Sequence, residues 1–393
     1  MSGSMTDTMT RNADETENRS PPGSAPLFRS SALPLFLLAL LLAGCLPSSN
    51  QRKLARDLFP SDSLSRRIAE AAPVDTLALV RRVEAPPEAI LEYPTSLALL
   101  GDGRIVVAET RRGALVTFDA QGTYRSALQY GAFRYPFLAG ALGDTVAVLS
   151  RGAHRVDLVV GDDVIGSVDV PAARNGAALL TPDGLYYKTA EDGAASTLYL
   201  LGLDGAERAR YTLRGPYWRH LGFLRAWGDS LLALSGYRPV VDVLRPGTPS
   251  GAVLDTLALV GFDSPQLARS RLWALGDVDE PPLLSPAAAP LGEHLFVLNA
   301  RPGWVHIDVF ERAEDGLRLQ RSLIQPDPGL TDLLPIDLAA RRVGDAVEFV
   351  ILTTKPEPGL TFYRWSPEPG SPDGGGIHSV PPSTRSARSR YPS

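Results

Sequence analysis

The sequence of 393 residues contains a single cysteine, Cys45, which excludes an intramolecular disulfide. It contains only five histidines, so imidazole is scarce for metal binding or acid–base catalysis. A Gly-x-Ser-x-Gly nucleophile elbow, a P-loop and a glycine-rich dinucleotide fingerprint are all missing. The net charge of -5 gives no reason to expect a nucleic-acid partner. We therefore predict no catalytic residue, no metal site and no cofactor, and we favour a protein that is not an enzyme.

The surroundings of the cysteine suggest why it is there. Arg29 precedes an apolar run over residues 33–42, which continues into Leu-Ala-Gly-Cys at positions 42–45. A basic flank, a short apolar core and small residues before a cut site are typical of a secretory signal. The Leu-Ala-Gly-Cys ending resembles the bacterial lipobox, whose cysteine receives diacylglycerol before cleavage on its N-terminal side. This resemblance implies that residues 1–44 are a leader and signal peptide, and that Cys45 is the lipid-attachment site.

The same resemblance implies a location. Leu46, in place of aspartate after the cysteine, favours the outer membrane with the protein facing the periplasm. The alternative is a buried core cysteine behind an ordinary signal. Residues 45–73 are expected to be a lipid-anchored tether with a short helix over 63–71. Residues 367–393 are rich in Pro, Gly, Ser and Arg, so we predict a disordered tail.

Between tether and tail, one pattern recurs six times: a Gly-Asp, Asp-Gly or Gly-Glu turn, then a β-rich run. The acidic turn residues lie at positions 102, 144, 183, 229, 293 and 345, which are 42, 39, 46, 64 and 52 residues apart. Four-stranded propeller blades take about 40–50 residues each. The pattern predicts an all-β fold, a six-bladed β-propeller of four-stranded blades over residues 74–366. The acidic residues serve tight turns. The longest interval holds an insertion at 261–284, in which residues 266–274 are expected to form a short helix.

A repeated hexapeptide bears on how the ring closes. Residues 75–80, Asp-Thr-Leu-Ala-Leu-Val, recur without change at 255–260, where the outer strand of the fourth blade is expected. The first copy stands alone before the first blade, and the sixth blade lacks an outer strand of its own. We expect this N-terminal segment to supply that strand, which closes the ring and removes its exposed edges.

The first blade also carries a family resemblance. Residues 94–122 contain Pro, then Asp-Gly-x-Ile-Val-Val-Ala-Glu, then Phe-Asp and Gly, and this pattern resembles NHL-type repeats of six-bladed propellers. The usual Asp after the Val-Ala pair is Glu109 here, and the Arg or Asn turn signature is partly present at 111–113. The resemblance covers residues 75–366 as architecture.

In propellers of this kind, one face carries the loops between second and third strands and the loops that join blades. Arginine, tyrosine and tryptophan dominate binding hot spots, and an arginine-lined face favours an anionic partner. The alternative is that each loop simply exposes one arginine of an arginine-rich chain. The candidate binding residues are Arg111, Arg112, Arg134, Tyr135, Arg151, His154, Arg174, Tyr217, Trp218, Arg219, His220, Tyr237, Arg238 and Arg301.

These observations leave three hypotheses open. The first is a membrane-tethered, non-catalytic propeller that binds a peptide, a glycan or a partner protein through the Arg/aromatic loop face. The second is a metal-dependent hydrolase or lyase acting at the central channel, where Glu109, Asn175 and Asn299 could supply ligands. The third is a structural envelope component that makes contacts through the sides of its blades.

Overall fold

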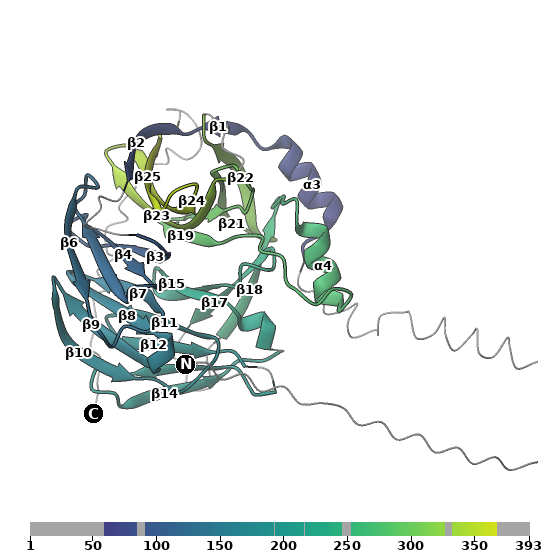
Figure 1. Cartoon of the computed structure of the whole chain (residues 1–393). Coiled ribbons are helices and arrows are strands. Elements are labelled where there is room, and N and C mark those ends of the chain that lie inside the picture. Colours follow the sequence, from purple (N-terminus) through teal and green to yellow (C-terminus); the bar gives the residue numbers. More distant parts are fainter. Residues whose placement is uncertain are drawn as a thin grey trace, which may run out of the picture. The chain divides into compact units, whose positions relative to one another are not determined.

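The computed structural model describes residues 59–84, 91–191, 193–215, 217–245, 253–326 and 332–367. In this part the chain is an all-β protein with two short α-helices (Figure 1). Cys45, the signal segment 1–44, the tether up to residue 58 and the tail from residue 368 lie outside the described residues. Among the helices described, none has the length and apolar character needed to cross a membrane.

The first three repeats each form a separate four-stranded antiparallel sheet in chain order. The first sheet contains β3 (Pro94–Leu99), β4 (Ile105–Glu109), β5 (Ala114–Phe118) and β6 (Tyr124–Gln129). The second contains β7 (Pro136–Leu142), β8 (Thr145–Ser150), β9 (Arg155–Val160) and β10 (Asp163–Asp169). The third contains β11 (Gly176–Thr181), β12 (Gly184–Thr189), β13 (Thr197–Leu201) and β14 (Glu207–Thr212).

The fourth and fifth repeats share one nine-stranded sheet, because their outer strands β18 and β22 pair in parallel. The fourth repeat contains β15 (Phe223–Trp227), β16 (Ser230–Leu234), β17 (Val240–Arg245) and β18 (Val253–Val260). The fifth contains β19 (Ala287–Leu291), β20 (His294–Leu298), β21 (His306–Ala313) and β22 (Gly316–Ile324), with β1 (Val74–Thr76) beside β22. The last sheet contains β23 (Leu334–Val343), β24 (Ala346–Lys355), β25 (Gly359–Trp365) and β2 (Ala78–Glu84).

The second strands of the repeats are mostly apolar because both of their faces are covered. In β4, Ile105 and Val107 join one apolar cluster, whereas Val106 and Ala108 join another on the opposite face. The first cluster includes side chains of the last sheet, and the second includes side chains of the second sheet. The outer strand β6 instead alternates half-buried and exposed side chains, as expected for period-two patterning at a surface.

The first strands of the six repeats also contact one another in order. β3 contacts β7, β7 contacts β11, and β11 contacts β15; β15 then contacts β19, β19 contacts β23, and β23 contacts β3. Each first strand therefore has two first strands as neighbours, and the last repeat adjoins the first.

Both copies of the hexapeptide lie at outer strands. Residues 255–260 lie in β18, and residues 75–80 span β1 and the start of β2. The N-terminal copy connects the last two repeats, since β1 pairs with β22 and β2 pairs antiparallel with β25. Asp75 accepts hydrogen bonds from Arg321 Nη1 at 2.8 Å and from Trp365 Nε1 at 2.9 Å. Strand pairing and a charge-assisted hydrogen bond thus attach this N-terminal segment to the fifth and sixth repeats.

The two predicted helices are confirmed: α3 (Asp62–Ala71) lies before β1, and α4 (Leu267–Leu275) lies in the insertion 261–284. In Figure 1 they lie close together beside β18 and β22. Phe59, just before α3, is buried against Ala274 of α4, with Trp218 packed on the same cluster. The insertion thus contacts Phe59, the first residue that the structure describes.

Candidate binding face

Several predicted site residues meet on the loop face, which we define as the end of the sheets where the first strands begin. Arg111, Arg112, Arg134 and Tyr135 line one pocket of about 740 Å³, together with Tyr93. We call it the tyrosine–arginine pocket. It lies where the first and second repeats adjoin, with the aromatic pair Tyr130 and Phe133 in its wall; these rings meet edge to face at 5.1 Å.

Positive charge exceeds negative charge in this pocket. Glu92 pairs with Arg111 at 2.8 Å and with Arg112 at 3.0 Å. Arg134 is exposed and has no ion pair within the described part of the chain. The rings of Tyr93 and Tyr135 are 64% and 66% exposed, so both are free to contact a partner. Two exposed tyrosines and three guanidiniums, against one solvent-accessible carboxylate, suit an anionic partner.

A buried carboxylate holds the rim of the pocket. Glu109, at the end of β4, is fully buried and accepts backbone N–H bonds from Glu92 at 2.8 Å, Tyr93 at 2.6 Å and Arg111 at 2.7 Å. Its two oxygens thus fix the loop before β3 and the loop after β4. Both Glu109 oxygens are engaged by backbone donors, so the residue positions the pocket, a function that sequence patterns did not reveal.

A second hollow, the channel cavity, lies among the first strands. Its volume is about 150 Å³, and residues of β3, β7, β11, β15 and β23 line it. Arg225 and Asp337 reach across it from the fourth and sixth repeats and pair at 3.2 Å. Burial raises the pKa of Asp337, although Arg225 and two backbone N–H groups, those of Leu97 and Leu338, oppose that effect.

Arg151 is the predicted site residue that lies in the channel cavity. It begins the turn η1 (Arg151–Ala153) after β8, and its guanidinium lies 3.7 Å from the centre of the Phe137 ring. Burial lowers its pKa, and no carboxylate pairs with it in the described residues. The turn packs on the tyrosine–arginine pocket, because the backbone N–H of Gly152 donates to the Arg134 carbonyl at 3.0 Å.

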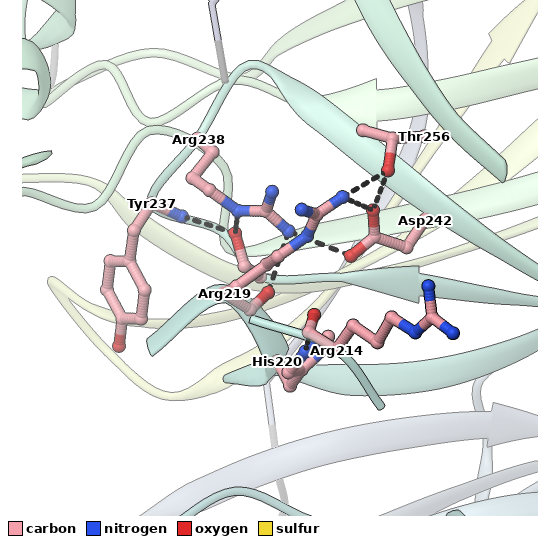
Figure 2. A network of polar contacts seen from close by, with 8 residues as sticks. Arg214, Arg219, His220, Tyr237, Arg238, Asp242 and Thr256 are labelled. Carbon is pink, nitrogen blue, oxygen red and sulfur yellow. Dashed lines mark hydrogen bonds and ion pairs between the residues drawn. The ribbon is translucent and has the colours of Figure 1, made fainter. Parts of the chain in front are cut away.

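The predicted residues of the fourth repeat form a separate polar network (Figure 2). Arg238 donates to Asp242 at 3.0 Å and to the carbonyl of Arg219 at 2.7 Å. Thr256 also donates to Asp242, at 2.8 Å, and Arg219 lies 3.7 Å from the same carboxylate. Burial alone would raise the pKa of Asp242, but Arg238 and Thr256 outweigh burial and lower it. Arg238 is only 1% exposed, so this network lies beneath the loop face rather than on it.

Two more titratable groups border the network. His220, in the turn η2 (Tyr217–His220), is buried and donates from Nε2 to the carbonyl of Arg214 at 3.0 Å. Burial lowers its pKa to about 4. Lys188 on β12 is fully buried, its Nζ has no hydrogen-bond partner in the described residues, and burial lowers its pKa to about 8. Tyr186 and Lys188 are two residues apart on β12 and therefore lie on the same face of the strand. Because Tyr186 packs against the fourth repeat, this spacing could have predicted that Lys188 is buried there as well.

The remaining predicted residues are dispersed. His154 is exposed with a left-handed backbone, and Arg174 is exposed while its backbone N–H donates to Glu191. Arg301 pairs with Asp263 at 2.9 Å. Trp218 and Tyr237 are half-buried, and the ring of each contacts the ring of Trp273 in α4. Tyr217 is half-buried in η2. The binding roles of all these residues stay predictions.

Of the potential oxygen ligands of the rival hypothesis, Glu109 is engaged by backbone N–H groups, whereas the side-chain oxygen of Asn299 is buried without a hydrogen-bond partner among the described residues. Asn299 donates to Asp308 at 2.9 Å inside the fifth repeat, and Asp308 is also bound by His306 and Ser322. Asn175 uses its backbone carbonyl to accept from Ala190. The described residues contain no group of three or more His, Cys, Asp or Glu side chains placed to hold a metal ion.

No family model matches the chain, and no curated protein matches it either. Among solved structures, a streptogramin B lyase is 13% identical, with a TM-score of 0.46 over 73% of this chain and 88% of that chain. The virginiamycin B lyase of Staphylococcus aureus is 12% identical, with a TM-score of 0.43 over 74% and 88%. A protein of Bacteroides fragilis described as exported is 11% identical, with a TM-score of 0.47 over 76% and 99%. The sheets themselves define the class of the chain: an all-β, propeller-like protein.

Proposed function

We propose that the chain is a six-bladed β-propeller closed by its own N-terminal strand. The ordered contacts of the six first strands support a ring, because the last repeat adjoins the first. The pairing of β2 with β25 supports closure, since the sixth repeat receives its outer strand from the start of the chain. Closure of this kind covers the edge that β25 would otherwise expose.

We infer that this propeller is a binding protein whose partner carries carboxylates, on an acidic peptide, a partner protein or an acidic glycan. One observation carries the inference: the tyrosine–arginine pocket combines three arginines with one solvent-accessible carboxylate, Glu92, beside the exposed residues Tyr93 and Tyr135. Guanidinium forks bind carboxylates bidentately, and tyrosine rings add contact area at low entropic cost.

We also propose that Cys45 carries the lipid that tethers the propeller to the envelope membrane, after removal of residues 1–44. The Leu-Ala-Gly-Cys ending at 42–45 supports this proposal. A Cys45→Ser variant should leave the detergent phase in detergent partitioning of cell envelopes, and mass spectrometry should find diacylglycerol on the first residue of the wild-type protein. An N-terminal peptide that begins elsewhere and carries no lipid would contradict the proposal.

Binding is tested with defined probes. Isothermal titration of the folded protein, produced from residue 46 onward, would use hexaglutamate as the peptide probe and trigalacturonate as the glycan probe. Hexaserine and neutral trigalactose are the uncharged counterparts. At least one charged probe should bind, its neutral counterpart should not, and added salt should weaken the binding because the charges are exposed.

A triple variant of the pocket is compared with a single-arginine control of similar exposure. The triple variant Arg111→Ser, Arg112→Ser, Arg134→Ser removes the cations of the pocket and should weaken binding at least tenfold. Arg125→Ser, on the first sheet but away from the loop face, changes an arginine that is 59% exposed, close to the 66% of Arg111. It should bind as the wild type does. Equal binding by the two variants, or no binding of either charged probe, would contradict the proposal.

A further inference from the structure

The channel cavity holds a cation that the fold does not neutralise. Arg151 has a buried Nε without a hydrogen-bond partner, and it forms no ion pair in the described part of the chain. Its guanidinium lies over the face of the Phe137 ring, 3.7 Å from the ring centre. A cation–π contact of this kind compensates a desolvated guanidinium only in part. The arrangement leaves one guanidinium that can bind an anion entering the cavity.

The other charges of the cavity are balanced. Arg225 donates to Asp337, and the Asp337 carboxylate also receives the backbone N–H groups of Leu97 and Leu338, each at 2.8 Å. One excess positive charge therefore remains, that of Arg151. A ligand with one negative charge would neutralise it, whereas a second negative charge would meet the carboxylate of Asp337 in a confined space.

Apart from Thr95 and Ser96, the rest of the wall is apolar or aromatic. Phe137, Phe223 and Ile336 line the cavity and are each half-buried, so solvent reaches their side chains. The volume of about 150 Å³ matches that of a protein cavity known to take benzene, a molecule of about six non-hydrogen atoms. A ligand of this site thus combines one anionic group with a short hydrocarbon part.

We propose that the channel cavity binds a short-chain monocarboxylate, with its carboxylate on Arg151 and its hydrocarbon chain between Phe137 and Phe223. The site is separate from the tyrosine–arginine pocket and does not depend on the partner proposed there. The carboxylate would supply the acceptor that the guanidinium lacks, and the chain would displace water from the two rings. Butyrate has the size and charge that the cavity requires.

Saturation-transfer NMR and isothermal titration with butyrate test the proposal on the folded protein. Butyramide has the same shape without the charge, and succinate adds a second carboxylate. Butyrate should bind saturably, while butyramide and succinate should bind at least tenfold more weakly. If butyramide binds as well as butyrate, the guanidinium is not the recognising group and the proposal fails. It also fails if the wild-type protein shows no saturable binding of butyrate.

Protein variants separate this site from the pocket beside it. Arg151→Met keeps a long side chain on Phe137 and removes an unpaired buried charge, so the protein should still fold, as thermal unfolding would verify. It should lose at least tenfold in affinity for butyrate, and Arg151→Lys should retain part of that affinity. The control, Arg134→Ser, alters the tyrosine–arginine pocket and should bind butyrate as the wild type does. Affinity within twofold of the wild type in folded Arg151→Met would overturn the proposal.

Discussion

Replacing the buried Lys188 tests most sharply how much the burial of a charged group lowers the stability of the fold. Burial lowers its pKa from 10.5 to about 8, and its Nζ finds no hydrogen-bond partner among the described residues. A lysine whose pKa is lower in the folded state than in the unfolded chain destabilises the folded state at every pH at which the unfolded chain is protonated. The difference of the two values corresponds to a cost of about 3 kcal/mol at neutral pH.

The prediction is that Lys188→Met increases the free energy of unfolding at pH 7 by about 1–3 kcal/mol, since Met fills similar space without a charge. The sign of the pH dependence follows from the same values. The wild type gains stability as pH rises from about 8 towards 10.5, because the unfolded chain still holds the proton that the folded state has already released. The advantage of the variant should therefore shrink over that interval.

Urea unfolding followed by tryptophan fluorescence, at pH 7 and at pH 10, measures both quantities. The matched control is Lys355→Met, because Lys355 is exposed at the end of β24 and its change should stay within about 0.5 kcal/mol. If Lys188→Met lowers stability at pH 7, or if its effect is the same at both pH values, the ammonium is stabilised by contacts that this reasoning omits.

Two further predictions concern acid sensitivity and the rim of the pocket. Burial lowers the pKa of His220 to about 4, so the wild type should lose up to about 3 kcal/mol as pH falls from 6.5 to 4. Melting temperatures across this range should show a smaller loss in His220→Gln, and equal slopes would contradict the assignment. Glu109→Gln weakens the acceptor of three backbone N–H bonds, so it should cost about 2 kcal/mol. Amide exchange should become faster at Tyr93 and Arg111, and unchanged protection there would refute the positioning role.

The sequence was informative where the structure depends on local rules. Gly-Asp turns and β-rich runs located the hairpins, because turn chemistry and period-two patterning act over a few residues. The repeated hexapeptide located β18 and the segment that pairs with the last sheets, since identical residues favour similar strand positions.

The site was less predictable because its contacts join residues far apart in the chain. Arg225 and Asp337 are 112 positions apart, and only the order of the repeats brings them together. Arg238 was expected on the loop face, yet it turns inward to Asp242, which lies four residues later on β17. An arginine beside a turn has the same sequence pattern whether it points outward or inward. The partner that fixes its direction is found only in three dimensions.

Photo-crosslinking in cells tests the proposed binding role most directly. A photoreactive phenylalanine analogue would replace Tyr135, which is 66% exposed in the tyrosine–arginine pocket, or Leu142, which is 44% exposed at the far end of β7. The proposal predicts an adduct with one envelope component from position 135 and none from position 142. The triple variant Arg111→Ser, Arg112→Ser, Arg134→Ser should abolish that adduct. The same adducts from both positions, or none from position 135, would contradict binding through this pocket.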